Sequence, residues 1–156
     1  MLDIIEQRER QYGNKRKMAG QWFMIRNKMN GLVLDIESNN TEPGASIVMW
    51  TPNCSDNQLW TVENNHIISK LSGMAIDIEG GNPTQGTRIV TWHQEDKEWQ
   101  KWSFEGSGAL VSQLGGGTLC LDVIDQQMEP GCKVGIWNHN GGENQQWELV
   151  LAPGCF

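Results

Sequence analysis

Three aspartates, each lying between two apolar residues, are the first candidates for binding chemistry in this sequence. They are Asp35, Asp77 and Asp122, and a tryptophan follows each of them 15 positions later, at Trp50, Trp92 and Trp137. An ionised carboxylate accepts hydrogen bonds from paired O–H donors, and an indole offers a flat apolar face to C–H groups. Because a sugar ring carries adjacent hydroxyls and one C–H patch, this pairing predicts a carbohydrate site.

A glutamine pattern shows that the three stretches are copies of one repeat. Gln-x-Trp begins at Gln58, Gln100 and Gln145, and each glutamine lies 23 residues after its aspartate. A glycine also lies six residues before each of the three tryptophans, at Gly44, Gly86 and Gly131. The copies start 42 and then 45 residues apart, and the glycine-rich stretches between Gln100 and Asp122 can take up the three additional residues.

Each repeat contains short apolar segments separated by Gly, Asn, Pro and Ser, which is typical of β-strands. We expect the repeats to open on strands at Phe23–Arg26, His66–Ser69 and Leu110–Ser112. Four strands in each of three repeats (about 21–63, 64–106 and 107–152) predict an all-β chain with almost no helix. Because one repeat cannot bury its own apolar face, the three must share a core, and this predicts a β-trefoil. A generic β-sandwich, the alternative, does not explain the threefold register.

These repeats resemble the ricin-B-type lectin family of β-trefoil lectins and carbohydrate-binding modules. In the first repeat the resemblance implies three sugar contacts: Asp35 accepts hydrogen bonds from the sugar hydroxyls, Trp50 lies under the ring and Asn57 adds a polar contact. It also implies that Gln58 braces the site and that Trp60 points into the core. The remaining positions that it implies are Asp122, Trp137, Asn144, Gln145 and core Trp147 in the third repeat, and Asp77, Trp92, Gln100 and core Trp102 in the second. The second repeat departs from the others, because Trp99 stands in the place of asparagine.

Galactose or N-acetylgalactosamine is the expected ligand class, because an axial hydroxyl and a continuous apolar face suit a carboxylate beside an indole. Up to three shallow sites on one rigid body predict multivalent binding to the glycans of glycoproteins or glycolipids. A β-trefoil that acts as a protein-interaction module or protease inhibitor is the alternative function. A further alternative is an accessory module of a glycosidase or toxin. We expect no catalysis, because the carboxylates belong to separate repeats and no nucleophile–base set stands out.

Charge argues against nucleic acid as a partner. The chain carries a formal net charge of −7, and residues 21–156 contain 7 basic and 16 acidic residues. Phosphate backbones need clustered Lys and Arg, which this acidic body lacks. An acid also lies two residues before each glutamine, at Asp56, Glu98 and Glu143. We expect no cofactor; solvated acids are favoured over the alternative, in which these carboxylates join the aspartates to bind Ca²⁺.

Residues 1–20 precede the repeats, and the expected lectin domain covers 21–156. This arm is expected to form either a short helix over about residues 3–12, which docks on the trefoil or on a second copy to give a homodimer, or a mobile segment. No membrane span or signal peptide is predicted, so we expect a soluble protein that is cytosolic or released without a leader. Free thiols are expected for Cys54, Cys120, Cys132 and Cys155, with one or two disulfides as the alternative.

Overall fold

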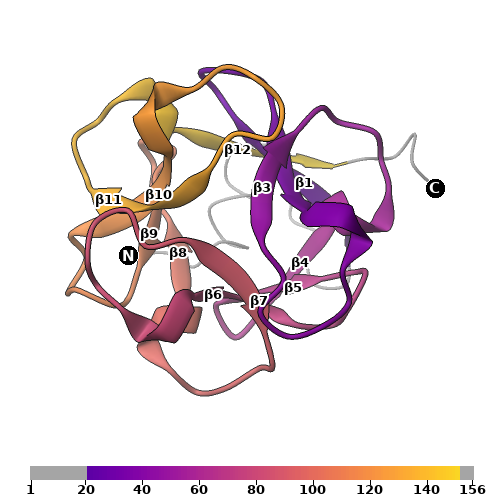
Figure 1. Cartoon of the computed structure of the whole chain (residues 1–156). Helices are drawn as coiled ribbons and strands as arrows, with labels where there is room; N and C mark the ends of the chain where they lie inside the picture. The colour runs from indigo at the N-terminus through magenta and orange to yellow at the C-terminus, as the bar shows by residue number, and fades with distance from the viewer. Residues whose placement is uncertain (1–20, 152–156) are drawn as a thin grey trace.

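The computed structural model describes residues 21–151, and all of its regular structure is β-strand or short 3₁₀ helix. Each repeat contributes four strands, and Figure 1 shows three similar lobes around one centre. The first repeat contains β1 (Phe23–Asn27), β2 (Val33–Ile36), β3 (Ile47–Trp50) and β4 (Trp60–Glu63). The second contains β5 (His66–Ser69), β6 (Ala75–Ile78), β7 (Ile89–Trp92) and β8 (Trp102–Phe104). The third contains β9 (Leu110–Ser112), β10 (Leu119–Val123), β11 (Val134–Asn138) and β12 (Trp147–Leu151).

The predicted β-trefoil is therefore confirmed, with strands at the three opening segments that the sequence indicated. The three additional residues between Gln100 and Asp122 are divided between two connections. Trp102 pairs with Ser112, 10 residues later, whereas Trp60 pairs with Ser69, 9 residues later, so the turn between β8 and β9 takes up one. The other two lie between Ser112 and Asp122, which are 10 residues apart, whereas Ser69 and Asp77 are 8 apart. The proposed arm at residues 1–20, with its helix, lies outside the described residues. Among the described residues, no helix is long and apolar enough to cross a membrane.

Two kinds of pairing close the structure. The last strand returns to the first, because β12 pairs antiparallel with β1 along its whole length, from Phe23 opposite Leu151 to Asn27 opposite Trp147. The hairpins β2–β3, β6–β7 and β10–β11 are then joined pairwise by single bridges: Ser46–Val90, Val48–Lys133 and Arg88–Gly135. Each hairpin thus contacts both of the others.

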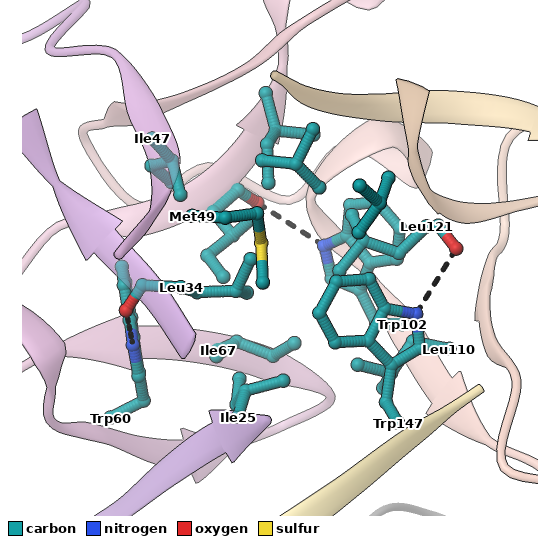
Figure 2. Close-up of a cluster of buried hydrophobic side chains, with 14 of the residues drawn as sticks. Ile25, Leu34, Ile47, Met49, Trp60, Ile67, Trp102, Leu110, Leu121 and Trp147 are labelled. Atoms are coloured by element: carbon teal, nitrogen blue, oxygen red, sulfur yellow. Dashed lines mark hydrogen bonds between the residues drawn. The ribbon is translucent and has the colours of Figure 1, made fainter. Parts of the chain in front are cut away.

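One core, built from all three repeats, fills the centre. Trp60, Trp102 and Trp147 are completely buried in it, which confirms their predicted core position. Each indole N–H donates to a backbone carbonyl of the strand that carries the site aspartate: Leu34 at 3.3 Å, Ile76 at 3.2 Å and Leu121 at 3.1 Å (Figure 2). The Gln-x-Trp tryptophan therefore couples the core to the strand that positions the site.

Free thiols are expected for the cysteines, and the structure shows them for two but not for Cys54. Cys120 and Cys132 are free and buried. Burial raises the pKa of the Cys120 thiol to about 12, with the nearby Asp122 adding to the shift. Cys54, in contrast, is disulfide-bonded, so the expectation of a free thiol is wrong for this residue.

Candidate functional site

A glutamine holds each of the three site aspartates (Asp35, Asp77 and Asp122). In the first repeat the Nε2 of Gln58 donates to Asp35 Oδ2 at 2.9 Å and to the Thr51 carbonyl at 2.9 Å, while its Oε1 accepts from the Asn53 N–H at 2.8 Å. Gln100 and Gln145 hold Asp77 and Asp122 in the same way, also at 2.9 Å. The bracing role predicted for these glutamines matches this geometry, because each one ties the aspartate strand to the loop after the tryptophan.

Burial sets the electrostatics of the site aspartates. Their residues are only 6%, 4% and 4% exposed, and desolvation raises the pKa of each carboxyl above its ordinary value of 3.8. Hydrogen bonds from the glutamines lower the pKa and partly offset this effect. No cation is among the causes that act on these groups, so the carboxylates are stabilised by neutral donors.

Asparagines support the aspartates in the first and third repeats. The Nδ2 of Asn57 donates to the Ile36 carbonyl, and that of Asn144 to the Val123 carbonyl, both at 3.1 Å. Both side chains also hydrogen-bond to the neighbouring aspartate, which lowers its pKa. In the second repeat the Trp99 side chain takes over this interaction with Asp77.

The platform tryptophans (Trp50, Trp92 and Trp137) lie at the surface. They are 45%, 40% and 39% exposed, in contrast to the buried Gln-x-Trp residues. Each one lies against a glycine of another repeat: a Cβ on Gly131 would be 3.6 Å from Trp50, and Cβ atoms on Gly44 and Gly86 would be 3.8 Å from Trp92 and Trp137. Each site is therefore completed by a neighbouring repeat, and an exposed indole face remains for a ligand.

Two of the sites form distinct cavities. The predicted residues Asp122, Trp137 and Asn144 line a cavity of about 350 Å³, together with Asp125 and Asn140. In the second repeat Asp77 and Trp92 line one of about 360 Å³. In the first repeat Asp35, Asn57 and Gln58 are joined by hydrogen bonds, and Trp50 ends the strand paired with the one that carries Asp35.

Sequence reasoning missed several residues that line these cavities. Asp125 and Gln126 line the third-repeat cavity, and Glu79 and Glu95 line the second. The missed signal for Glu95 was its register, because it lies 18 residues after Asp77, where the other repeats have Asn53 and Asn140. This position supplies the N–H that every bracing glutamine accepts.

The acids considered for Ca²⁺ binding take other positions. Asp56 lies at the start of a 3₁₀ helix, with Oδ1 3.4 Å from the Lys70 ammonium. Glu98 and Glu143 begin the corresponding helices, whose bounds are Asp56–Gln58, Glu98–Gln100 and Glu143–Gln145. In the part of the chain that the structure describes, no group of three or more His, Cys, Asp or Glu side chains is arranged to hold a metal ion.

Known proteins that are similar to this chain, over all or part of their length, include lectins and an enzyme. Mucoricin of Rhizopus delemar is 42% identical over 52 residues, which are 32% of this chain and 35% of mucoricin, so the match spans about a third of that relative. The C-terminal half of an earthworm R-type lectin, solved in complex with GalNAc, is 30% identical with a TM-score of 0.73, over 84% of this chain and 98% of that one. An exo-β-1,3-galactanase from Clostridium thermocellum is 30% identical with a TM-score of 0.76, over 85% of this chain but only 30% of the enzyme.

The family model of the ricin-type β-trefoil lectin domain matches residues 21–147. That range contains the three site aspartates, their bracing glutamines and the platform tryptophans. The chain therefore belongs to the ricin-type β-trefoil lectin domain family.

Proposed function

We propose that this chain is a lectin that binds glycans ending in galactose or N-acetylgalactosamine and does not catalyse a reaction. The third-repeat cavity carries the proposal, because a buried, oriented carboxylate (Asp122) and an exposed indole (Trp137) line the same space of about 350 Å³. We assign this activity to a domain of residues 21–156. The GalNAc complex of the earthworm relative supports the choice of sugar.

The chemistry of the site favours a galactose-type ring. Asp122 has one oxygen held by Gln145, which leaves lone pairs for adjacent sugar hydroxyls. An axial hydroxyl leaves one face of the ring as a continuous C–H surface, which packs on an indole such as Trp137. A ring without that continuous face buries less apolar area against the same tryptophan, so it binds more weakly.

Binding without catalysis is favoured by the way the carboxyl groups are held. Glycoside hydrolysis needs two carboxyl groups on either side of one bond, one of them free to donate a proton. The site aspartates Asp77 and Asp122 lie in different cavities, and each has one oxygen occupied by a glutamine. In the second-repeat cavity the other two carboxyls are also engaged, because Glu79 pairs with Arg88 and Glu95 accepts from the Trp92 indole. The enzyme relative does not weaken this interpretation, because the match covers only 30% of the galactanase chain.

A glycan array with the full chain tests the proposal. Binding should concentrate on terminal galactose or N-acetylgalactosamine, and the Asp35→Ala/Asp122→Ala variant should lose most of it. Glu143→Gln, which removes one exposed charge beside the third-repeat site, is the matched control and should bind like the unchanged chain. A blank array for a folded chain would overturn the proposal and favour a protein-interaction module, whose binding should survive the aspartate substitutions.

A further inference from the structure

The second repeat breaks the threefold pattern at two positions of its site. Eighteen residues after the site aspartate, the first and third repeats have Asn53 and Asn140, whereas the second has Glu95. Twenty-two residues after the aspartate, they have asparagine again, whereas the second has Trp99. Both changes lie between Trp92 at the end of β7 and Trp102 at the start of β8, and both residues line the same cavity.

Glu95 presents its carboxylate differently from its counterparts. Asn53 and Asn140 turn their Oδ1 to their own loops and accept from the N–H groups of Ser55 and Gly142, both at 2.9 Å. The Glu95 Oε1 instead accepts from the indole N–H of Trp92 at 2.9 Å. The carboxylate is thereby held beside the platform ring and lines the cavity.

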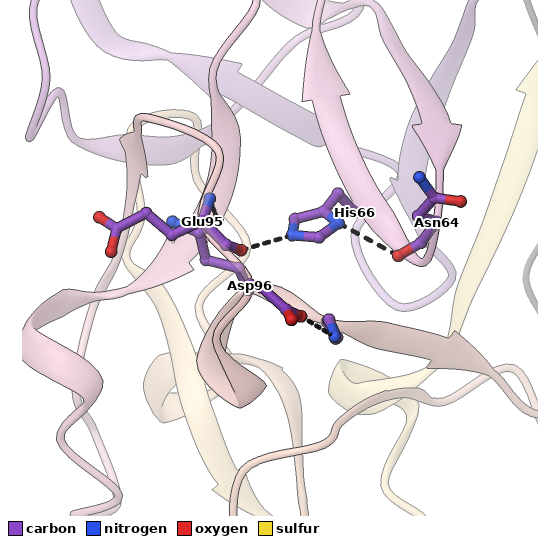
Figure 3. A network of polar contacts seen from close by, with 6 residues as sticks. Asn64, His66, Glu95 and Asp96 are labelled. Carbon is purple, nitrogen blue, oxygen red and sulfur yellow. Dashed lines mark hydrogen bonds and ion pairs between the residues drawn. The ribbon is translucent and has the colours of Figure 1, made fainter.

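The backbone of Glu95 is anchored from the opposite direction. Its carbonyl oxygen lies 2.8 Å from Nε2 of the buried His66, whose Nδ1 is 3.1 Å from the Asn64 carbonyl. Figure 3 shows the Glu95 side chain extending away from His66. This contact holds the loop in place, so that the carboxylate remains on the cavity side.

Trp99 adds a second aromatic wall in a fixed position. It is half-buried, packs against the central core and lies so close to Gly81 that a Cβ there would be 2.9 Å from the indole ring. Trp92 and Trp99 both line the cavity of about 360 Å³. A ligand in this cavity therefore meets two indole rings, whereas the third-repeat cavity is lined by one.

All of the charged residues that line the cavity are acidic. Asp77, Glu79 and Glu95 contribute three carboxylates, and no basic side chain is among the residues that line it. The basic groups nearby are outside the lining: Arg88 pairs with Glu79, and the Lys97 ammonium is 5.7 Å from the centre of the Trp99 ring. Carboxylates together with indole faces form the environment that stabilises an ammonium group.

We propose that the second-repeat site selects a hexose with a free, protonated amino group, such as an unacetylated galactosamine residue. This inference rests on the proposed sugar-binding function, because the bracing pair Asp77–Gln100 and the platform Trp92 are retained here. The hydroxyls bind to Asp77 as in the other repeats. The ammonium group lies between the indole rings and pairs with the Glu95 carboxylate.

The experiment follows the indole N–H signals of the platform tryptophans by NMR while the full chain is titrated with galactosamine, galactose or N-acetylgalactosamine. At about pH 6, an amine is protonated. We expect galactosamine to bind about 3- to 10-fold more tightly than galactose at Trp92, with no such preference at Trp50 or Trp137.

Glu95→Gln removes the charge but keeps an acceptor for the Trp92 indole, so it should abolish the preference at Trp92 without unfolding the loop. Glu98→Gln removes a charge from the same repeat outside the cavity lining and should leave the preference unchanged. The Glu95→Asn/Trp99→Asn variant restores the residues of the other repeats and should make the second site behave like the third.

Three outcomes overturn the inference, and one of them also overturns the proposed function. If galactose shifts the Trp50 and Trp137 signals but galactosamine gains nothing at Trp92, the inference fails and the lectin function stands. A preference that survives Glu95→Gln also refutes it. If no sugar shifts the signal of any platform tryptophan, the proposed function and the inference fail together.

Discussion

At the scale of single residues, the site depends on carboxylates that are buried beside neutral amides. Gln145 gives Asp122 a hydrogen bond without cancelling its charge, so the carboxylate remains available to ligand hydroxyls. The cost of this arrangement is desolvation, which raises the pKa of all three site aspartates. The same burial that orients the carboxylate therefore makes it easier to protonate.

This shift predicts that sugar binding weakens on acidification at a higher pH than an ordinary aspartate would give. Protonation removes an acceptor of paired hydroxyls, so the midpoint of binding against pH should lie above 3.8, the ordinary value for these groups. Tryptophan fluorescence titrations with galactose between about pH 7 and about pH 3 measure the midpoint. A midpoint at or below 3.8 would contradict the prediction.

Ionisation of the site aspartates should affect the free energy of unfolding and sugar binding in opposite directions: sugar binding strengthens as pH rises, whereas the folded chain becomes less stable. A pKa that is higher in the folded chain means that the folded state binds the proton more tightly than the unfolded state. The contribution of each site aspartate to stability is therefore fully present below pH 3.8 and is lost as pH rises through the folded-state value. In the Asp122→Asn variant, the free energy of unfolding measured with urea should fall less as pH rises. The same dependence on pH in the variant and the unchanged chain would contradict this prediction.

The bracing glutamine should matter more for folding than its neighbour in sequence. Gln145→Ala leaves Asp122 and the Asn138 carbonyl without their donor at 2.9 Å, and the Asn140 N–H without its acceptor. We expect the free energy of unfolding to fall by about 2–3 kcal/mol. Gln146→Ala, the control, removes only a 3.2 Å bond to the Gly141 carbonyl and should cost less than about 1 kcal/mol. Equal losses in urea unfolding would refute the bracing role.

At the scale of elements, the sites lie where one hairpin meets the next. Gly131 precedes β11 and donates its N–H to the Met49 carbonyl of β3 at 2.7 Å, while Trp50 at the end of β3 lies over it. Its φ of +91° is in the region that favours glycine. The position of the first-repeat platform thus depends on a glycine from the third repeat.

Gly131→Ala should therefore impair both the fold and a site in another repeat. The strained backbone should lower the free energy of unfolding by about 1–2 kcal/mol. Displacement of the backbone at residue 131 should weaken galactose binding at Trp50 more than at Trp92. The indole N–H signals of the two tryptophans measure this difference by NMR. Gly106→Ala is the control, because its φ is not in this region and no atom lies within 4 Å of its Cβ. Equal weakening at both tryptophans would contradict the junction argument.

At the scale of the whole molecule, closure of the three repeats holds the proposed sites on one rigid body. The bridges between hairpins and the shared core of Trp60, Trp102 and Trp147 fix their relative positions. Rigidly linked sites gain avidity on a surface that presents many glycans, and the gain reaches about 10²–10⁴-fold when the spacing fits.

Removing one platform should therefore affect surface binding far more than binding of free sugar. For Trp137→Ala we expect apparent affinity for a dense galactose surface to fall about 10- to 100-fold, measured by surface plasmon resonance. Affinity for free galactose at the remaining sites should not change. Met128→Ala, which removes an exposed side chain outside the cavity lining, is the control. If the apparent affinity for the surface falls no more than is expected from losing one of three independent sites, multivalent binding is contradicted.

The spacing within each repeat predicts the trefoil, and the resemblance to the ricin-B-type lectins predicts the buried Gln-x-Trp tryptophans and a bracing role for each glutamine. The bond from each glutamine to its aspartate lies within one repeat, so it recurs at the same separation of 23 residues. The register 18 residues after Asp77 marks the position of Glu95 as part of the site. The direction of its side chain, and of the Asp125 side chain, could not be predicted from spacing, because it depends on local hydrogen bonds.

Only the tertiary structure decided which repeat completes which site. The sequence places Gly44 six residues before Trp50, yet six residues of extended chain span about 20 Å, so the two cannot share a site. Gly44 instead lies against Trp92 of the second repeat, and Gly131 of the third lies against Trp50. The reason is closure: a contact between repeats is created when three hairpins pack around one centre, and no spacing inside a single repeat encodes it.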